Sequence, residues 1–472
     1  MAAPSTSAAQ TGRRSYGTTP RINGQRMMDT IHTTCEAWGQ AHRYGDHHTE
    51  TGMARLALDD NDAHVRRWFA EQVEALGCTV TVDQVGNQFA VRPGKTNTDA
   101  NGNKVAPTFM GSHLDTQATG GRYDGILGVL AGLEALRTIH EQGIETQGPI
   151  GLVNWTNEEG ARFPLITMAS GVWAGVTPLE TAWNTKETPA AAAIYGNSDR
   201  PATVKEELQR IGFLGDTPAT HTAMPMAAHF ELHIEQGPIL ETEQRKIGVV
   251  EGAQGYAWYE VTVRGKDAHA GTTPLHTRKD ALLAAAQMIF AGNGVAQSES
   301  ASTPEKKGVV TTGVVSALPG TPNTIPHTAQ FTLDIRHPSP ERLAAMVDAC
   351  RSQFAAIAGK TGVEVDWKCL SDNAPAIFHP DCVAAVQAAA EEEVGTVTTR
   401  EGETQQGWRR IWSGAGHDSC NVNKHYPASM IFTVTRDGLS HTPVEYCSPE
   451  DCIVGAQVLL GAVLRFDAKR EL

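Results

Sequence analysis

The chain has 472 residues, of which 40% are apolar and 19% charged, a composition typical of a soluble globular protein. This length exceeds what one hydrophobic core usually organises, so two domains are expected. The formal net charge of -14 disfavours nucleic acid or an anionic membrane surface as the main partner, because both need a positive surface. A small anionic substrate remains compatible with it, and the apolar stretches are too short for a membrane span.

The N-terminal segment and the cysteines indicate in which cellular compartment the protein is expected. Residues 1–21 are expected to form a disordered tail. The first acidic residue is Asp29, and several arginines precede it, so this segment also resembles a mitochondrial transit peptide. The eight cysteines lack the spacing of a disulfide scaffold or zinc finger, which favours reduced core thiols and the cytoplasm. The mitochondrion stays open as an alternative.

The first half of the chain alternates between helical and strand patterns. Segment 62–76 places its apolar residues on one helical face and ends at Gly77. The following patterns predict a strand pair over 79–92, a strand over 108–112, a helix over 126–139 and a strand over 150–155. Such alternation indicates an α/β sheet, whose ligands gather beyond the carboxyl ends of the strands. His113 and Glu158 each follow a strand, so both are expected to face one crevice.

A different order of elements follows from about residue 253. Strand, helix, strand, strand, helix and strand are predicted over 257–264, 278–291, 308–318, 328–336, 341–358 and 363–367. This β-α-β-β-α-β order is the ferredoxin-like arrangement. Helix and strand patterns then return over 381–393, 429–434 and 449–466. We therefore expect an α/β catalytic domain over 22–252 and 369–472, interrupted by a ferredoxin-like domain over 253–368.

Three short motifs place an imidazole and several carboxylates in loops or at strand ends. They are Gly111-Ser-His-Leu-Asp115, Gly121-Arg-Tyr-Asp-Gly125 and Asn157-Glu-Glu-Gly160. Mixed nitrogen and oxygen ligands of this kind suit zinc or a related divalent ion. In a dinuclear hydrolase one carboxylate ligates metal while another takes the proton from bound water. The adjacent Glu158 and Glu159 can divide these two roles.

Two further patterns contain histidines. Between residues 229 and 235, histidines and glutamates alternate with apolar residues, which predicts a strand with one polar and one buried face. Periodicity alone allows either His229 or His233 to ligate a metal. Gly438-Leu-Ser-His-Thr-Pro443 places His441 in a loop, a pattern that by itself indicates an ordinary loop histidine.

Eight motifs in order carry a resemblance to a known family. They are GSHLDT, GGRYDGILGVLAGLEAL, WTNEEGARF, ELHIEQGPILE, GKDAHAGTTP, TPNTIP, SGAGHDS and GLSHTP. The chain resembles the N-carbamoyl-L-amino acid amidohydrolases, allantoate amidohydrolases and fungal-type β-ureidopropionases over residues 22–464. These are dinuclear amidohydrolases related to zinc carboxypeptidases and aminoacylases. Among them, the sequence looks most similar to the fungal β-ureidopropionases.

The resemblance implies a pair of divalent metal ions, zinc first, with manganese or cobalt as alternatives. His113, Asp124 and His233 would hold one ion, and Asp124, Glu159 and His441 the other, so that Asp124 bridges them. Asp115 would orient His113, and Glu158 would be the general base. The family's ligand is the histidine of HIEQGP, which selects His233 over His229.

The resemblance also implies the substrate contacts and the oligomer. The inserted domain would be a lid and dimerisation domain that makes a homodimer. His269 would stabilise the oxyanion, while Asn323 and Arg336 would bind the substrate carboxylate. Gln236 and the segment Gly414, Ala415 and Gly416 would complete the pocket.

The expected reaction is hydrolysis of the ureido bond of an N-carbamoyl amino acid, with N-carbamoyl-β-alanine as the first expectation. It would yield β-alanine, carbon dioxide and ammonia. N-carbamoyl-L-amino acids and allantoate are the alternatives, followed by a metallopeptidase or aminoacylase activity. A non-catalytic binding protein of the same fold is disfavoured because Glu158 and all five ligands are present.

Overall fold

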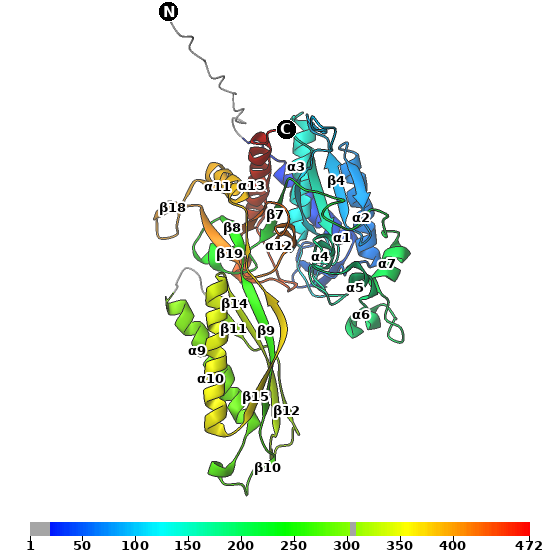
Figure 1. The fold of residues 1–472 in the computed structure, drawn as a ribbon. Coiled ribbons are helices and arrows are strands. Elements are labelled where there is room, and N and C mark those ends of the chain that lie inside the picture. The colour runs from blue at the N-terminus through cyan, green and yellow to red at the C-terminus, as the bar shows by residue number, and fades with distance from the viewer. Residues whose placement is uncertain (1–18, 303–307) are drawn as a thin grey trace, which may run out of the picture. The chain divides into compact units, whose positions relative to one another are not determined.

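The computed structural model describes residues 19–302 and 308–472. The chain splits into two compact units (Figure 1). The large unit contains the described residues up to Glu251 together with Phe378–Ile411 and His417–Leu472, and the small unit contains Gly252–Ile377 and Trp412–Gly416. Most of the expected N-terminal tail, residues 1–18, lies outside the described residues. Residues 19–21 are not a free tail, because Thr19 and Arg21 bond to Glu392 and Glu393 on a helix of the large unit.

A mixed sheet forms the centre of the large unit. Its strands run in the order β8-β20-β7-β5-β6-β4-β3, and β19 also pairs with β8. The neighbours β20 and β7, β7 and β5, and β5 and β6 are parallel, whereas the outer pairs are antiparallel. The carboxyl ends of the four parallel strands therefore meet at one edge. The bounds are β3 Thr79–Val82, β4 Gln88–Arg92, β5 Thr108–His113, β6 Ile150–Trp155, β7 Ala228–Ile234, β8 Ile247–Ala253, β19 Trp408–Ser413 and β20 Ala428–Thr433.

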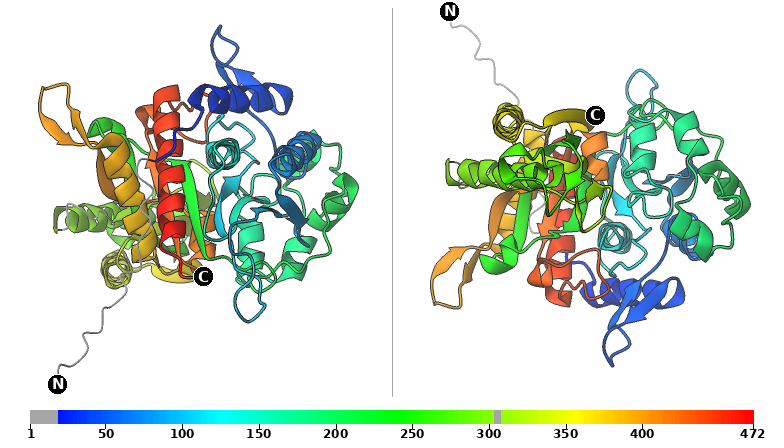
Figure 2. Two further views of the ribbon diagram at one scale, coloured as in Figure 1. Left: turned by 90° about the horizontal axis from the view of Figure 1, so that it is seen from above. Right: turned by 90° about the horizontal axis from the view of Figure 1, so that it is seen from below.

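Helices cover this sheet, and two short hairpins lie outside it. Helix α13 packs beside α3 and α11 and against β7 and β20 (Figure 2). The helices are α1 Gly24–Ala37, α2 Asp60–Glu74, α3 Ile126–Glu141, α4 Met168–Trp173, α5 Leu179–Asn184, α6 Pro189–Ile194, α7 Val204–Ile211, α8 Ile239–Thr242, α11 Pro380–Val394, α12 Asp418–Val422 and α13 Pro449–Ala468. The hairpins are β1 Gln40–Arg43 with β2 Thr51–Met53, and β17 Thr396–Thr398 with β18 Thr404–Gln406.

Strand β7 is buried on both faces, although its alternating sequence predicted one polar and one buried face. Phe230 contacts Phe466 of α13 in an edge-to-face ring pair. On the opposite face, His229 bonds to Ser419 of α12 at 3.0 Å, and Glu231 accepts the Ser419 hydroxyl at 2.7 Å. The polar face is therefore covered by protein, and internal hydrogen bonds engage Nδ1 of His229 and the Glu231 carboxylate. Among the described residues, Nε2 of His229 has no hydrogen-bond partner.

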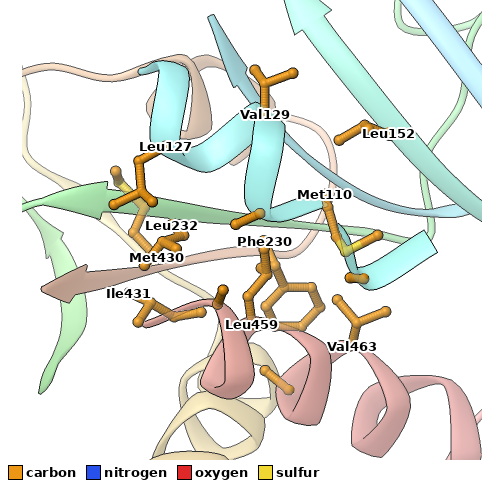
Figure 3. Packing of buried hydrophobic residues seen from close by; sticks show 14 of the residues in the cluster. Met110, Leu127, Val129, Leu152, Phe230, Leu232, Met430, Ile431, Leu459 and Val463 are labelled. Carbon is orange, nitrogen blue, oxygen red and sulfur yellow. The ribbon is translucent and has the colours of Figure 1, made fainter. Parts of the chain in front are cut away.

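Helix α3 packs closely over the sheet because two glycines face it. A side chain at Gly128 would lie 2.4 Å from the carbonyl oxygen of Leu232, and one at Gly132 would lie 2.4 Å from Leu152. Figure 3 shows the apolar layer that results, with Phe230 and Met110 among the buried side chains. The i, i+4 spacing of these glycines thus brings α3 onto β5, β6 and β7.

The small unit has the expected β-α-β-β-α-β order. Its sheet runs β11-β14-β9-β15, all antiparallel, with β12 also pairing with β14. Helices α9 and α10 lie side by side against the sheet (Figure 1). The bounds are β9 Gly255–Arg264, β10 Ala268–His269, α9 Ala281–Ser302, β11 Val309–Thr311, β12 Val315–Leu318, β13 Thr324–Ile325, β14 Thr328–His337, α10 Pro340–Thr361, β15 Glu364–Asn373 and β16 Ala376–Ile377, with a 3-10 turn at Leu275–Thr277.

Several predicted bounds of the small unit differ from the structure. The single strand expected over 308–318 is two short strands, and the helix expected over 278–291 is α9, which runs on to Ser302. The second boundary expected at 368/369 falls inside β15, because that strand stays paired with β9 up to Asn373. Residues 412–416, expected in the catalytic domain, belong to the small unit.

Two chemical features concern the whole chain. All eight cysteines are free thiols, and most are buried. Among the described residues, no helix combines the length and hydropathy that a bilayer crossing requires.

Candidate metal centre

Five side chains converge at the carboxyl edge of the parallel strands. His113 is the last residue of β5, Glu159 follows β6, and His233 is near the end of β7. Asp124 lies in the loop between β5 and α3, and His441 in the loop that follows the 3-10 turn Arg436–Gly438 after β20. Ligand-binding crevices of open α/β sheets lie at this edge. The five residues thus come from four neighbouring strands and the loops that follow them.

The five residues form two groups of three that share Asp124. In each group the candidate ligand atoms lie within 4.8 Å of one another: His113, Asp124 and His233 form the inner trio, and Asp124, Glu159 and His441 the outer trio. The Oδ1 atom of Asp124 lies 3.1 Å from Nε2 of His233, and its Oδ2 atom lies 3.3 Å from Nε2 of His441. One carboxylate therefore faces both groups, one oxygen to each.

The two inner histidines are oriented by main-chain carbonyls. Nδ1 of His113 bonds to the carbonyl oxygen of Asp115, and Nδ1 of His233 to that of Ile234, both at 2.9 Å. A bond of this kind keeps a proton on Nδ1 of a metal-binding histidine and leaves Nε2 for the metal. Here Nε2 is the atom of both histidines that faces Asp124. Asp115, which the resemblance implied would orient His113, contacts it through its main-chain carbonyl and not through its carboxylate. That carboxylate instead accepts the amides of Glu158 and Glu159.

The charges at this edge suit cations. Burial lowers the pKa of His113 to about 4, so that its imidazole is neutral, as ligation requires. Burial and the nearby Asp124 raise the pKa of Glu159 to about 8. Hydrogen bonding to Asp124 raises the pKa of His441 to about 9. Among the described residues, the basic side chains that face Asp124 are all imidazoles, those of His113, His233 and His441. In this cluster protons offset the negative charge of buried carboxylates. Divalent ions can offset the same charge, so this set of imidazole and carboxylate donors fits a metal site.

Glu158 lies beside the inner trio. One of its carboxylate oxygens is 3.5 Å from Nε2 of His113, and its side chain is 12% exposed. Burial and the neighbouring carboxylates, first Asp418 and then Glu159, raise its pKa well above the usual value. A carboxyl group with a raised pKa can hold and release a proton near neutral pH.

Comparison with known proteins identifies the family. The model of peptidase family M20/M25/M40 matches residues 109–465. Over 449 residues the chain is 39% identical to the N-carbamoyl-L-amino-acid amidohydrolase of Rhizobium meliloti, covering 95% of this chain and 97% of that protein. The chain belongs to peptidase family M20/M25/M40.

Further relatives indicate to which branch of the M20 family this chain is most similar. It is 33% identical to the N-carbamoyl-L-amino acid amidohydrolase of Geobacillus stearothermophilus, over 87% of this chain and 93% of that one. It is 31% identical to the ureidoglycolate hydrolase of Oryza sativa subsp. japonica, over 88% and 80%. The crystal structure of an amidase of the hydantoinase/carbamoylase family from Burkholderia multivorans matches with a TM-score of 0.81 and 41% identity, over 96% and 99%. The chain is a hydrolase of the amidohydrolase branch that acts on a small molecule, and family members depend on metal.

The residues predicted to contact substrate fall into three places in this M20-family chain. The amide nitrogen of Gln236, in the large unit, donates to Oδ2 of Asp124 at 2.8 Å. His269 and Asn323 are close together, because β10 pairs with β13 and the amide of Ala270 donates to the Asn323 carbonyl. Arg336 lies elsewhere in the small unit.

The guanidinium of Arg336 already has protein partners. Its Nε and Nη2 atoms bond to the Asp334 carboxylate, at 3.0 and 2.8 Å, and its Nη1 donates to the Gly414 carbonyl at 2.7 Å. This places Arg336 next to the segment Gly414, Ala415 and Gly416, which the sequence assigned to the same pocket. A substrate carboxylate would therefore join or replace Asp334 at the guanidinium.

Sequence reasoning missed several polar residues that support the trios. Gln117 donates to Glu159 at 2.7 Å, and the Ser440 hydroxyl lies 3.0 Å from Oδ2 of Asp124. Glu445 accepts the amides of Tyr123 and Asp124. Each missed residue lies within four positions of a predicted ligand or of Asp115. Polar residues near candidate ligands in the sequence were the available signal.

Proposed function

We propose that the chain hydrolyses the ureido C–N bond of N-carbamoyl-L-amino acids with the aid of two divalent metal ions. The observation that carries the proposal is the pair of trios sharing Asp124, taken with relatives that are named for this activity at 39% and 33% identity. These names favour an α-amino acid product over the β-alanine that we first expected. Zinc is the first candidate for both ions, with manganese and cobalt as alternatives.

The chain's own residues divide the work. His113, Asp124 and His233 would hold one ion, and Asp124, Glu159 and His441 the other. When bound, such a pair lowers the pKa of water and polarises a carbonyl group. Glu158 takes the proton of the attacking water and returns it to the departing amine nitrogen. The carbamate that remains decomposes to carbon dioxide and ammonia.

A substrate panel tests this function. N-carbamoyl-L-amino acids, N-carbamoyl-β-alanine, allantoate, ureidoglycolate, an N-acetyl amino acid and a dipeptide are incubated with the metal-loaded protein and with the Glu158→Gln variant. We expect release of both ammonia and free amino acid from the N-carbamoyl-L-amino acids by the wild type alone. Cleavage of only the acetyl or peptide substrates would overturn the proposal in favour of an aminoacylase or peptidase.

Arg336 is our candidate for the substrate carboxylate. Its guanidinium can bind a carboxylate by two parallel hydrogen bonds, which an ammonium group cannot reproduce. We expect Arg336→Lys to raise KM strongly for the acid substrate and only slightly for its neutral amide. Equal effects on both substrates would mean that Arg336 serves the fold through Asp334.

We further propose a homodimer built through the small unit, in the reducing cytoplasm that suits free thiols. His269 pairs with Thr324 just before β14, whereas Arg336 is near the far end of β14. The eight steps along the strand from Thr328 to Arg336 span roughly 26 Å. One small substrate cannot touch both ends within one chain, so a shared role for His269 and Arg336 requires a second copy.

Exposed apolar residues of the small unit support this dimer. Leu283 and Phe290 of α9 are 55% and 81% exposed, and Val315 and Leu318 of the short strand β12 are 51% and 57% exposed. Apolar patches and open sheet edges are typical of interfaces between chains. Sedimentation is expected to give a dimer at micromolar concentration. A monomer that retains full activity would overturn this proposal.

A further inference from the structure

Glu445 is a buried carboxylate that the proposed reaction does not use. It lies four residues after His441 and is 2% exposed. Its Oε1 atom accepts the amide hydrogens of Tyr123 at 3.1 Å and Asp124 at 3.0 Å. Its Oε2 atom accepts the Ser440 hydroxyl at 3.0 Å. Burying a carboxylate costs free energy unless it is hydrogen-bonded, and here both oxygens are used.

The loop around Asp124 is shaped to admit this carboxylate. A side chain at Gly121 would place its first carbon 2.2 Å from Oε1 of Glu445 and 2.4 Å from its Cβ. No side chain fits at such distances, so Gly121, the second glycine of GGRYDG, leaves the space that Glu445 occupies. The contact thus depends on two positions that are more than 300 residues apart.

Glu445 connects the two loops that carry the outer trio. Through Oε1 it holds the backbone of Asp124, and through Oε2 it holds Ser440, the residue before His441. The Ser440 hydroxyl also lies 3.0 Å from Oδ2 of Asp124, the oxygen that faces His441 at 3.3 Å. His441 has a positive φ of 57°, a conformation that the surrounding structure must enforce.

We propose that Glu445 is a positioning residue that fixes Asp124 and His441 at the spacing required by the outer metal ion. This inference rests on the proposed metal centre. It assigns to Glu445 no contact with metal or substrate. Its effect on the inner ion is small, because His113 and His233 lie on β5 and β7 and are oriented by the main-chain carbonyls of Asp115 and Ile234.

The test replaces Glu445 with glutamine. A carboxylate accepts hydrogen bonds at both oxygens, whereas an amide accepts at only one, so either the two backbone amides or Ser440 loses its acceptor. Asp467→Asn is the matched control. Asp467 is also buried and accepts two backbone amides, those of Gln147 and Gly148, and it contacts neither trio. Ser440→Ala is a second variant that leaves Glu445 unchanged and removes the contact of its Oε2 atom, together with the hydroxyl's own contact to Oδ2 of Asp124.

The measurement is stepwise titration of metal-free protein with Co²⁺, followed by visible absorption, alongside thermal unfolding. We expect Glu445→Gln to bind the second ion about 10–100-fold more weakly, as loss of partners of metal ligands typically does, with first-ion affinity unchanged. Ser440→Ala should show the same selectivity with a smaller loss. Asp467→Asn should bind both ions like the wild type.

Three outcomes would overturn the inference. They are wild-type binding of both ions by Glu445→Gln, equal weakening of both ions, and the same loss in Asp467→Asn. If Glu445→Gln does not fold, Ser440→Ala decides by the same criterion. If the wild type itself binds no pair of ions, the proposed metal centre is wrong. This result distinguishes failure of the metal centre from failure of the role proposed for Glu445.

Discussion

The two trios share Asp124 but are built differently. His113 and His233 lie on central strands, and their side chains are 2% and 1% exposed. His441 lies on a loop with a side chain that is 51% exposed. Strand positions are fixed by packing on both faces of the sheet, whereas loop positions depend on a few hydrogen bonds. The inner half of the site is therefore set by the core, and the outer half by local polar contacts.

The largest effect is expected from Asp124→Ala, because this carboxylate belongs to both trios. We expect the variant to hold no pair of ions and to lose all detectable turnover. Metal analysis by mass spectrometry checks the first expectation. If this variant still bound two ions per chain, Asp124 would not be a ligand shared by both ions.

Glu158→Gln should have the next largest effect. It removes the proton acceptor and no metal ligand, so turnover should fall by about 10²–10⁴-fold while both ions remain. Metal content and kcat are measured on the same preparation. Loss of an ion would show that Glu158 and Glu159 have exchanged roles.

His441→Ala sharpens the comparison directly. We expect it to lose one ion and keep the other, because the inner trio retains its three residues. In the wild type, dialysis against a chelator should remove one ion faster than the other, and the fast phase should be absent in His441→Ala. Equal release rates of both ions in the wild type would contradict the difference between the trios.

The smallest effect is expected from a substitution in the hydrophobic core beneath the inner trio, and it concerns the stability of the fold. Gly128→Ala forces a methyl group against the Leu232 carbonyl, and such overpacking costs about 1–3 kcal/mol of unfolding free energy. Denaturant unfolding measures it. Gly359→Ala on α10 is the control, because nothing lies within 4 Å of the added carbon, so we expect a slight gain in stability.

The pattern of the sequence was sufficient for much of the fold. Helices α3 and α13 lie where apolar periodicity predicted them, because a long buried helix repeats its signal over many residues. Strands β5, β6 and β7 are short, and their apolar or alternating runs predicted them. The small unit's order of elements was also predicted. Short helices such as α5 and α6 were missed, since six residues carry too little periodicity. The length of α9 was missed because packing overrode the glycines at 292 and 294.

The candidate site also has features that the sequence predicted and features that only the tertiary structure shows. The sequence by itself determined the residue types, their order and their position after strands, and these suffice for the prediction of a metal hydrolase. Periodicity could not separate His229 from His233, since both point to the same face of β7. The resemblance selected His233, and only the tertiary structure shows how their surroundings differ. His229 bonds to Ser419 of α12, whereas His233 meets Asp124 at the edge of the sheet. Contacts such as Glu445 with Asp124 join residues 321 positions apart, and no local pattern contains them.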